Sequence, residues 1–384
     1  MIQSIHDRLV DSRASSRGQL PRRSRPAVLR KYENALAVHE IEPLEDHRWV
    51  DFLQRHPRSS LFHTVPWLEA LRHTYGYEPI AYTTSSGTDL QNALLFCRVN
   101  SWLTGHRLVS VPFSDHCDPL VDDGPDLKDL TLAIQHQLFR EKLRYIEIRP
   151  LHAALKEASS LFQPTRAYCF HQLDLRPDLD TLYSNCHKST RRNIRRAERE
   201  GLIYEHGCSK SLLDAFFSLY VLTRRRHQAP PQPKAWFVNL IDGFGESLKI
   251  RVASRNGQAL AAVLTLRYRD TLTYKYGGSD PHFNNLGGTH FLIWQMIQEA
   301  KKDGLRVLDL GRSEYRNQGL VTFKDRLGGA PSTLTYSRFT SPAYSRAHHE
   351  TGGNRWGHVA RAVVSNLPDR MFCAVGSLVY KHIG

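Results

Sequence analysis

The stretch that decides the fold is residues 274–328, YKYGGSDPHFNNLGGTHFLIWQMIQEAKKDGLRVLDLGRSEYRNQGLVTFKDRLG. Its pattern predicts a strand, a loop with adjacent glycines, a helix of about four turns, a second strand and a polar loop ending at Phe323-Lys324. A helix N-terminus has unpaired backbone N–H groups and the positive end of the helix dipole, so a Gly-Gly loop that opens a helix can hold a phosphate. The residues expected to do so are Asn284, Gly287, Gly288 and Thr289.

The second strand of this stretch leads into polar residues that can form a site. Arg312, Glu314 and Lys324 follow its carboxyl end, which is where open α/β sheets place their ligands. The stretch therefore predicts a site for a phosphate-bearing donor, with Arg312 and Glu314 as binding residues.

The whole chain is basic. Its 384 residues carry a net charge of +14, which favours anionic partners such as phosphates, nucleic acid or an acidic membrane face. The length allows two domains of ordinary size. Because the first 31 residues hold eight Lys or Arg against two Asp, we interpret residues 1–40 as a basic disordered tail. A transit peptide is the alternative, and the lack of an apolar core argues against a secretory signal.

The cysteines and the apolar runs argue against a disulfide-rich, zinc-finger or membrane-spanning protein. Six cysteines show neither a CxxC pair nor regular spacing, which argues against a disulfide framework or a zinc finger and favours a reducing, cytoplasmic location. No apolar run approaches the roughly 20 residues needed to span a bilayer. Residues 371–380 predict a C-terminal helix, either packed against the protein or lying at a membrane interface.

The two halves of the chain repeat each other in their expected elements, in the order helix, three-strand meander, helix, strand. The first half gives 65–75, 80–84, 92–99, 107–111, 126–141 and 144–149; the second gives 212–227, 249–254, 259–268, 271–277, 288–302 and 305–310. The repeat predicts an α/β fold of two tandem domains, each with a mixed, mainly antiparallel sheet flanked by helices. We expect the domains at 41–165 and 166–340, followed by a linker and helix at 341–384.

Residues 188–199, KSTRRNIRRAER, carry the densest positive charge, with five Arg and one Lys in twelve residues. On a helix, several of these side chains share one face at three- and four-residue spacing. We interpret Lys188, Arg191, Arg192 and Arg195 as phosphate-binding residues, with a solvated helix face as the alternative. A sugar diphosphate or a tRNA end fits better than duplex nucleic acid, because neither a recognition-helix motif nor an aromatic platform accompanies the cluster.

Two further loops carry polar residues. Arg226 and His227 end the helix expected at 212–227 and precede a proline-rich loop, so they either cap that helix or reach a ligand. In PFSDHCDP, residues 112–119, Asp115 follows a strand. Adjacent residues rarely point at one ion, so no metal is expected here. The segment is either an ordinary turn or a source of a carboxylate or imidazole for a cleft between the halves.

The Ser and Cys residues give no sign of a catalytic nucleophile on the protein, which favours direct reaction between two bound substrates. No Ser or Cys lies in a GxSxG context. Direct attack by a substrate amine on an activated acyl group would require the protein to orient two substrates and stabilise the developing oxyanion. We interpret Lys324 as the charge stabiliser, and we include Asp115 and Tyr276 as candidate catalytic residues. Tyr274 and Tyr276 are expected on one strand face, as core or as walls of the substrate site.

HKSTRRNIRRAEREGL, TRRRHQAPPQP, PFSDHCDPL and the 274–328 stretch together resemble the FemAB-related proteins of the GNAT acyltransferase superfamily, and most closely the branch associated with exopolysaccharide and exosortase systems. The resemblance covers residues 45–340. It implies two GNAT-like halves, and activity as an N-acyltransferase. Better-known members transfer an amino acid from aminoacyl-tRNA to a peptidoglycan precursor, and other branches resemble acyl-CoA-dependent enzymes. By resemblance, Arg191 and Arg192 lie near acceptor phosphates and Lys324 lies at the donor end.

Two departures from the family bear on the donor. The GNAT pyrophosphate loop is reduced here to Asn284-x-x-Gly287-x-Thr289, and no long helical hairpin follows residue 201. We expect transfer from acyl-CoA or a similar donor to an amine of an envelope polysaccharide or peptidoglycan precursor, sugar-nucleotide or lipid-linked, on the cytoplasmic face of the membrane. The alternatives are aminoacyl-tRNA-dependent transfer to a peptidoglycan precursor, and a non-catalytic binding module for anionic glycan or RNA.

Overall fold

The computed structural model describes residues 38–122, 124–152, 161–341 and 364–383. Two runs of elements within it have the same order: strand, two helices, three strands, helix, strand. The first run is β1 (His39–Ile41), α2 (Arg48–Arg55), α3 (Val65–Tyr75), β2 (Glu78–Thr83), β3 (Leu94–Ser101), β4 (Gly105–Val109), α4 (Pro125–Arg140) and β5 (Tyr145–Ile148). The second run is β7 (Ile203–Gly207), α8 (Lys210–Arg226), α9 (Lys234–Phe244), β8 (Leu248–Arg255), β9 (Gln258–Tyr268), β10 (Thr271–Ser279), α10 (Gly288–Lys302) and β11 (Val307–Ser313).

Strand pairing repeats as well. In each run the first three pairs are antiparallel and the last pair, β4 with β5 or β10 with β11, is parallel. A parallel pair needs a crossover connection, which α4 and α10 supply. The predicted duplication of element order is therefore present in the described residues, and we call the two runs the first and second repeats.

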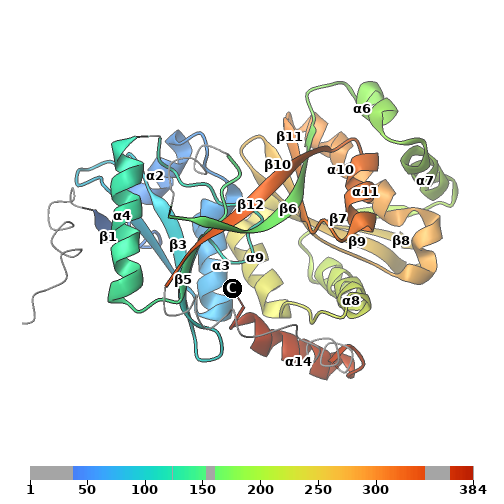
Figure 1. The fold of residues 1–384 in the computed structure, drawn as a ribbon. Coiled ribbons are helices and arrows are strands. Elements are labelled where there is room, and N and C mark those ends of the chain that lie inside the picture. Colours follow the sequence, from blue (N-terminus) through green and yellow to red (C-terminus); the bar gives the residue numbers. More distant parts are fainter. Residues whose placement is uncertain (1–37, 123, 153–160, 342–363, 384) are drawn as a thin grey trace, which may run out of the picture. The chain divides into compact units, whose positions relative to one another are not determined.

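Two long strands join the repeats into one sheet. β6 (Gln163–Asp174) pairs with β11, and β12 (Ala330–Thr340) pairs with both β6 and β5. The described strands form a 12-stranded sheet in the order β1-β2-β3-β4-β5-β12-β6-β11-β10-β9-β8-β7, with β12 and β6 crossing its middle (Figure 1). The mixed α/β architecture is as predicted. The boundary expected at residue 165 falls inside β6 and stays a prediction.

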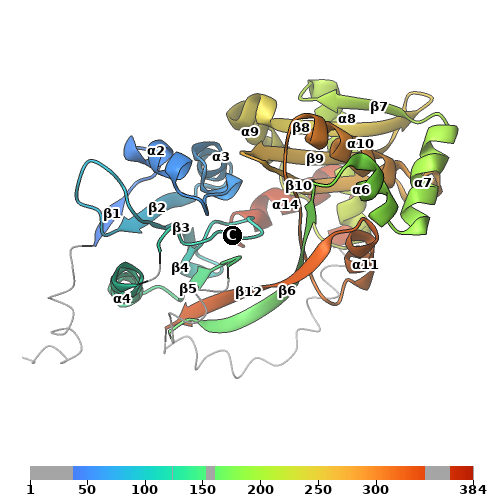
Figure 2. The same cartoon turned by 90° about the horizontal axis from the view of Figure 1, so that it is seen from above.

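Helices cover both faces of this sheet. On one face α2, α3, α8 and α9 share a single apolar core that runs across both repeats, in which Trp67 of α3 meets Trp236 of α9 edge-on with ring centroids 5.2 Å apart. On the other face α4 covers the first repeat and α10 covers the second, each over a separate core. Figure 2 shows α4 and α10 over different parts of the sheet. The continuous core holds the two repeats in one arrangement, so that side chains from both can form one site.

The remaining elements extend from the two long strands. α6 (Leu179–Asn185) and α7 (Lys188–Arg199) follow β6, α11 (Gln318–Arg326) precedes β12, and α14 (Asp369–Tyr380) is near the C-terminus, with short 3-10 turns at Leu61–His63, Gly245–Ser247 and Pro281–Leu286. α11 corrects the predicted polar loop. Asn317 caps its first turn, accepting from the backbone N–H of Leu320, so a segment without clear apolar periodicity is helical.

Most of the predicted N-terminal tail lies outside the described residues, as does most of the 341–384 linker. Across the described ranges, none of the helices combines the length and the apolar character needed to cross a bilayer.

Candidate active site

The site begins where the parallel pair of the second repeat separates. Pairing between β10 and β11 is confined to Thr271–Thr273 and Val307–Asp309. Beyond those residues β10 has a bulge between Tyr274 and Tyr276, and β11 has one between Asp309 and Gly311. Bulges bend a strand and redirect its side chains, and they are frequent next to active sites. The separation leaves a space between the two strands, which we call the strand opening.

The bulge in β10 corrects one prediction. A regular strand would put Tyr274 and Tyr276 on one face, but the extra residue sends them to opposite faces. Tyr274 packs against the cores under α10, whereas Tyr276 packs in the core under α8 and α9. The Tyr276 hydroxyl accepts a hydrogen bond from Trp236 Nε1 at 2.9 Å.

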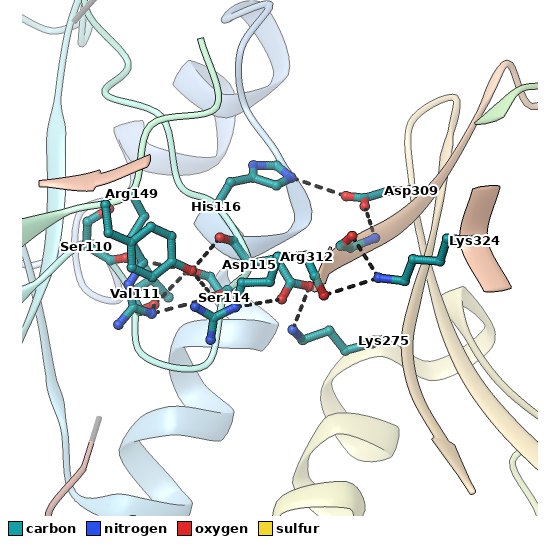
Figure 3. Close-up of polar contacts among 12 residues, drawn as sticks. Ser110, Val111, Ser114, Asp115, His116, Arg149, Lys275, Asp309, Arg312 and Lys324 are labelled. Carbon is teal, nitrogen blue, oxygen red and sulfur yellow. Dashed lines mark hydrogen bonds and ion pairs between the residues drawn. The ribbon is translucent and has the colours of Figure 1, made fainter. Parts of the chain in front are cut away.

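Asp115 of the first repeat enters the strand opening (Figure 3). Its Oδ2 lies 2.9 Å from Lys275 Nζ, and its Oδ1 lies 3.5 Å from Arg312 Nε. A Cβ built on Gly311 would lie 3.0 Å from the same Oδ2, so β11 passes close to this carboxylate. Burial alone would raise the pKa of Asp115, but Lys275 and Arg312 outweigh it and hold that pKa below its ordinary value. The predicted carboxylate between the halves is therefore present, as an ionised group held by two cations.

The backbone of residues 110–118, which carries Asp115, is strained and held in place. Val111 and Phe113 have φ values of 51° and 61°, a region that β-branched and bulky residues rarely adopt. Arg149 donates to the Val111 carbonyl at 2.9 Å, and the Tyr336 hydroxyl donates to the Asp115 carbonyl at 2.6 Å. Such strain persists only where the surroundings fix it, and it concentrates at functional sites.

Lys275 is the main site residue that the sequence did not predict. Its side chain is 6% exposed and lies within 6 Å of the ring centroids of Phe62, Trp67 and Tyr276. Burial lowers the pKa of Lys275 although Asp115 acts in the opposite direction. A lysine between two tyrosines in a strand was visible in the sequence, but only the bulge turns it toward Asp115.

Lys324, predicted as the charge stabiliser, comes from α11 and is 3% exposed. Its ammonium donates to the carbonyls of Gly311 at 2.9 Å and Arg312 at 3.1 Å (Figure 3). Burial lowers the pKa of Lys324 to about 8, although Asp115 and Asp309 act in the opposite direction. An ammonium has three donor hydrogens, so two carbonyl bonds leave one for a ligand.

A second contact between the repeats supports the β11 bulge. His116 Nε2 lies 3.2 Å from Asp309 Oδ2, and the other oxygen of Asp309 accepts from the backbone N–H of Gly311 at 2.7 Å. Gly311 has φ of +71°, which a residue with a Cβ rarely adopts. The sequence offered the His116 imidazole beside the Asp115 carboxylate as a group for the cleft between the halves, but it did not indicate Asp309 as its partner.

The start of α10, where the sequence predicts a phosphate-binding loop, lies beside these groups. Gly287 has φ of +78°, and a Cβ there would lie 2.4 Å from the Asn193 carbonyl oxygen, so only glycine fits. Asn284, Gly287, Gly288 and Thr289 line the same cavity as Lys324. His290, which the sequence did not single out, lines it too, and burial lowers its pKa to about 4. The backbone N–H groups of this first helical turn are available for an anion.

Asp115, Lys275, Lys324 and the start of α10 border one cavity of about 1550 Å³. Its lining among the described residues includes ten Lys or Arg side chains but only two carboxylates, Asp115 and Glu147. Arg312 stacks over the rings of Tyr168 and Tyr336, with its guanidinium carbon 4.4 and 4.9 Å from the ring centroids. Such a wall of planar cations and rings suits phosphates and flat polar ligands.

The predicted site residues divide between two places. The cavity is lined by Asp115, Arg226, His227, Tyr276, Arg312 and Lys324. Lys188, Arg191, Arg192 and Arg195 instead line a separate groove of about 900 Å³ along α7, which we call the α7 groove. Arg312 and Lys324 therefore border a different space from the basic side chains of α7. Glu314 lines neither space and forms an exposed ion pair with Arg316.

The described part of the chain contains no group of three or more His, Cys, Asp or Glu arranged to hold a metal ion.

A protein family and a relative with a named activity each match part of this chain. Residues 184–324 match the family described as acetyltransferase (GNAT) domain. A UDP-N-acetylmuramoylpentapeptide-lysine N(6)-alanyltransferase of Weissella viridescens is 30% identical over 155 residues, which are 38% of this chain and 45% of that protein. The match thus spans less than half of that relative's length.

Solved structures resemble the fold over most of the chain. The crystal structure of FemX matches 82% of this chain and 99% of its own, with a TM-score of 0.63 and 14% identity. A tandem GNAT protein from the clavulanic acid biosynthesis pathway matches 79% and 98%, with a TM-score of 0.51 and 9% identity. At these identities the likeness concerns the fold, and it extends to both repeats. Residues 184–324 are thus similar to a GNAT acetyltransferase domain, and they lie within a fold similar to those of FemX and of a tandem GNAT protein.

Proposed function

We propose that the protein is a transferase that moves an aminoacyl group from aminoacyl-tRNA to an amine of a peptidoglycan or related envelope precursor. The observation that carries this proposal is the buried ammonium of Lys324 beside the strand opening, in a cavity that also holds the start of α10 and a large excess of cations. A positive, partly dry cavity stabilises the negative charge that develops when an amine attacks an ester carbonyl.

The donor is the point on which the sequence-based expectation changes. The sequence alone favours acyl-CoA as the donor and leaves aminoacyl-tRNA as the alternative. The alanyltransferase relative favours the alternative, because its name describes transfer of an amino acid to a lysine amine of a UDP-linked muropeptide. The dimensions agree: the cavity exceeds the roughly 300–1,000 Å³ of most small-ligand sites, and the basic α7 groove adds a second anion-binding surface.

In this proposal the acceptor amine attacks the ester carbonyl of the donor, a C–N bond forms and the ester C–O bond breaks. The proton lost by the amine ends on the departing tRNA hydroxyl. Lys324 donates its remaining N–H to the carbonyl oxygen, while the Gly311 and Arg312 carbonyls fix the ammonium. Asp115 has two cationic partners and a lowered pKa, which makes it a poor proton acceptor at neutral pH. We assign it the positioning of Lys275 and Arg312 rather than a direct role in proton transfer.

The remaining site residues receive binding roles. The backbone of residues 287–289 and the side chain of Arg312 contact phosphate or terminal sugar of the donor. Arg226 and His227 line another part of the same cavity, on the last turn of α8 and the residue after it, and contact the acceptor. The acceptor class, the cytoplasmic location and the exopolysaccharide-associated branch stay predictions.

The test is a transfer reaction with defined donors. Purified protein is incubated with a UDP-linked or lipid-linked muropeptide and either charged tRNA or an acyl-CoA pool, and the acceptor mass is followed. We expect an aminoacyl mass increase with charged tRNA. A mass increase with acyl-CoA alone would contradict the proposed donor, and no transfer from either would contradict the proposed chemistry. Lys324→Met should slow the increase about 10²–10³-fold, whereas Lys302→Met, on the exposed end of α10, should preserve it.

A further inference from the structure

An exposed apolar surface lies at one edge of the cavity, and we propose that it docks the protein on an anionic membrane. We call it the rim patch; it consists of Trp102, Leu103, Met371, Leu378 and Ile383. These side chains are 85%, 59%, 55%, 62% and 50% exposed, among the highest values for large apolar residues in the described ranges. Docking concerns where the enzyme works, and its occurrence does not depend on the proposed function.

α14 is the largest part of the rim patch and is apolar on two sides. Its inner side, with Phe372, Gly376 and Tyr380, is buried, and Gly376 lies so close to the Pro231 carbonyl that a Cβ would come within 2.0 Å. Its outer side carries Met371 and Leu378, two turns apart and open to solvent. A helix that is apolar on both sides needs a second partner. The sequence left two alternatives for this helix, packed against the protein or lying at a membrane interface. Its inner side is packed against the protein, and we assign its outer side to the interface.

The end of α14 meets the β3–β4 turn, which brings Trp102 and Leu103 into the same surface. The Thr104 hydroxyl donates to the His382 carbonyl at 2.6 Å, and the Trp102 and His382 ring centroids are 5.6 Å apart. Tryptophan favours membrane–water interfaces because its ring is apolar while its N–H is polar. An almost fully exposed tryptophan beside Ile383 therefore favours a lipid surface over open water.

Charge around the rim patch selects an anionic surface. Arg370 and Lys381 flank the apolar side of α14, and both are exposed. The helix has a single acidic residue, Asp369, which forms an ion pair with Arg225 at 2.6 Å. Basic residues beside an apolar helix face add electrostatic attraction to anionic lipid headgroups.

The rim patch is continuous with the cavity. Leu103, His382 and Ile383 are part of the cavity lining, together with Arg107 and Arg144. A membrane that contacts Trp102 and Leu378 would face this edge of the cavity. An acceptor anchored by a lipid could then enter with its polar head while its chain stays in the bilayer. The geometry thus favours a lipid-linked acceptor over a freely diffusing sugar nucleotide.

The experiment is co-sedimentation of the full chain with vesicles of phosphatidylcholine alone or mixed with phosphatidylglycerol. We expect binding to the anionic vesicles, weakened by added salt. Leu378→Asp and Trp102→Ala should each lower the partition coefficient about tenfold or more, because each removes an apolar side chain from the interface. Val50→Asp, at a 48% exposed position on α2, is the matched control and should bind as the wild type does.

Failure of docking can be told apart from failure of the proposed function. Transfer to a soluble acceptor without vesicles should be unchanged in Leu378→Asp, while transfer to a lipid-anchored acceptor should fall with vesicle binding. Wild-type protein that transfers but binds no vesicles would overturn the docking proposal alone. A concentration-dependent dimer that Leu378→Asp dissociates would also overturn it, because the rim patch would then bind a second copy. Vesicle binding without transfer would leave docking supported and contradict the proposed function.

Discussion

The two repeats share a pairing pattern and differ in what happens where their parallel strands end. In the first repeat the chain stays joined beyond β4, because the Ser110 N–H donates to the Glu147 carbonyl at 2.8 Å, and Arg149 and Glu147 form a buried ion pair there. In the second repeat β10 and β11 pair over three residues, as β4 and β5 do, but both strands bulge beyond that point and Asp115 enters between them. The first repeat thus closes its own opening and supplies the carboxylate that enters the opening of the second.

The crossover helices α4 and α10 also differ between the two repeats, at their N-termini. α4 begins at Gly124-Pro125, and proline has no backbone N–H to donate, whereas α10 begins at Gly287-Gly288, which line the cavity. One repeat has kept an anion-binding helix start and the other lacks part of it. In the proposed function this difference corresponds to a division of labour, in which the first repeat holds the site in place and the second repeat binds the donor. Four changes test that division.

The largest effect is expected from Asp115→Ala, which removes the contribution of the first repeat. Lys275 would remain a buried cation without its carboxylate, and breaking a buried pair on one side costs about 3–5 kcal/mol. We expect that loss in the free energy of unfolding, measured by denaturant titration. In Asp115→Asn/Lys275→Met both charges are removed, and most of the stability should return. Equal losses in the single and double variants would contradict the pairing.

Lys324→Met tests the second repeat. Removing one donor to a developing oxyanion typically costs about 10²–10³ in kcat, and we expect a loss of that size with acceptor binding retained. If the charged ammonium is required, wild-type activity should fall as pH rises through about 8. The lowered pKa also means that the unfolded chain binds more protons between about 8 and 10.5, so wild-type stability should rise with pH in that window. Lys324→Met should lack that rise.

Gly287→Ala separates backbone strain from a steric clash. Gly287 and Gly76 have nearly equal φ values, +78° and +72°, but a Cβ meets the Asn193 carbonyl only at Gly287 and nothing within 4 Å at Gly76. Alanine in this conformation costs about 1 kcal/mol at either site, and the clash adds about 1–2 kcal/mol at Gly287. Thermal unfolding midpoints should rank Gly287→Ala below Gly76→Ala. The opposite order would show that α7 yields to the added methyl group.

The sequence predicted the repeats because each depends on local patterns. α10 begins and ends at the predicted residues 288 and 302, since Gly287 opens it and apolar residues repeat along one face. β6 and β12 were not predicted, because their partners are distant in sequence and six of the 12 residues of β6 and four of the 11 of β12 are exposed. The same holds within the site. Lys324 and the 284–289 loop follow from their own segment, whereas Lys275 and His116 acquire their roles from partners in the other repeat.

The smallest effect is expected at the α7 groove, which has no counterpart in the first repeat among the described elements. Arg192 and Arg195 lie on its exposed side, and Asn193 between them contacts the start of α10, so an RNA held in the groove could reach the cavity. Arg192→Ala/Arg195→Ala should weaken charged-tRNA binding about tenfold and reduce the salt slope by about one for each phosphate that is no longer neutralised. Arg140→Ala on α4, also an exposed helix arginine, should leave the tRNA affinity and the salt slope unchanged.

Because acyl-CoA is too small to fill the cavity and the groove together, its use should not change in the double variant. If acyl-CoA binding instead weakened as much as tRNA binding, the α7 groove would contribute to the binding of either donor. It would then not explain a preference for tRNA.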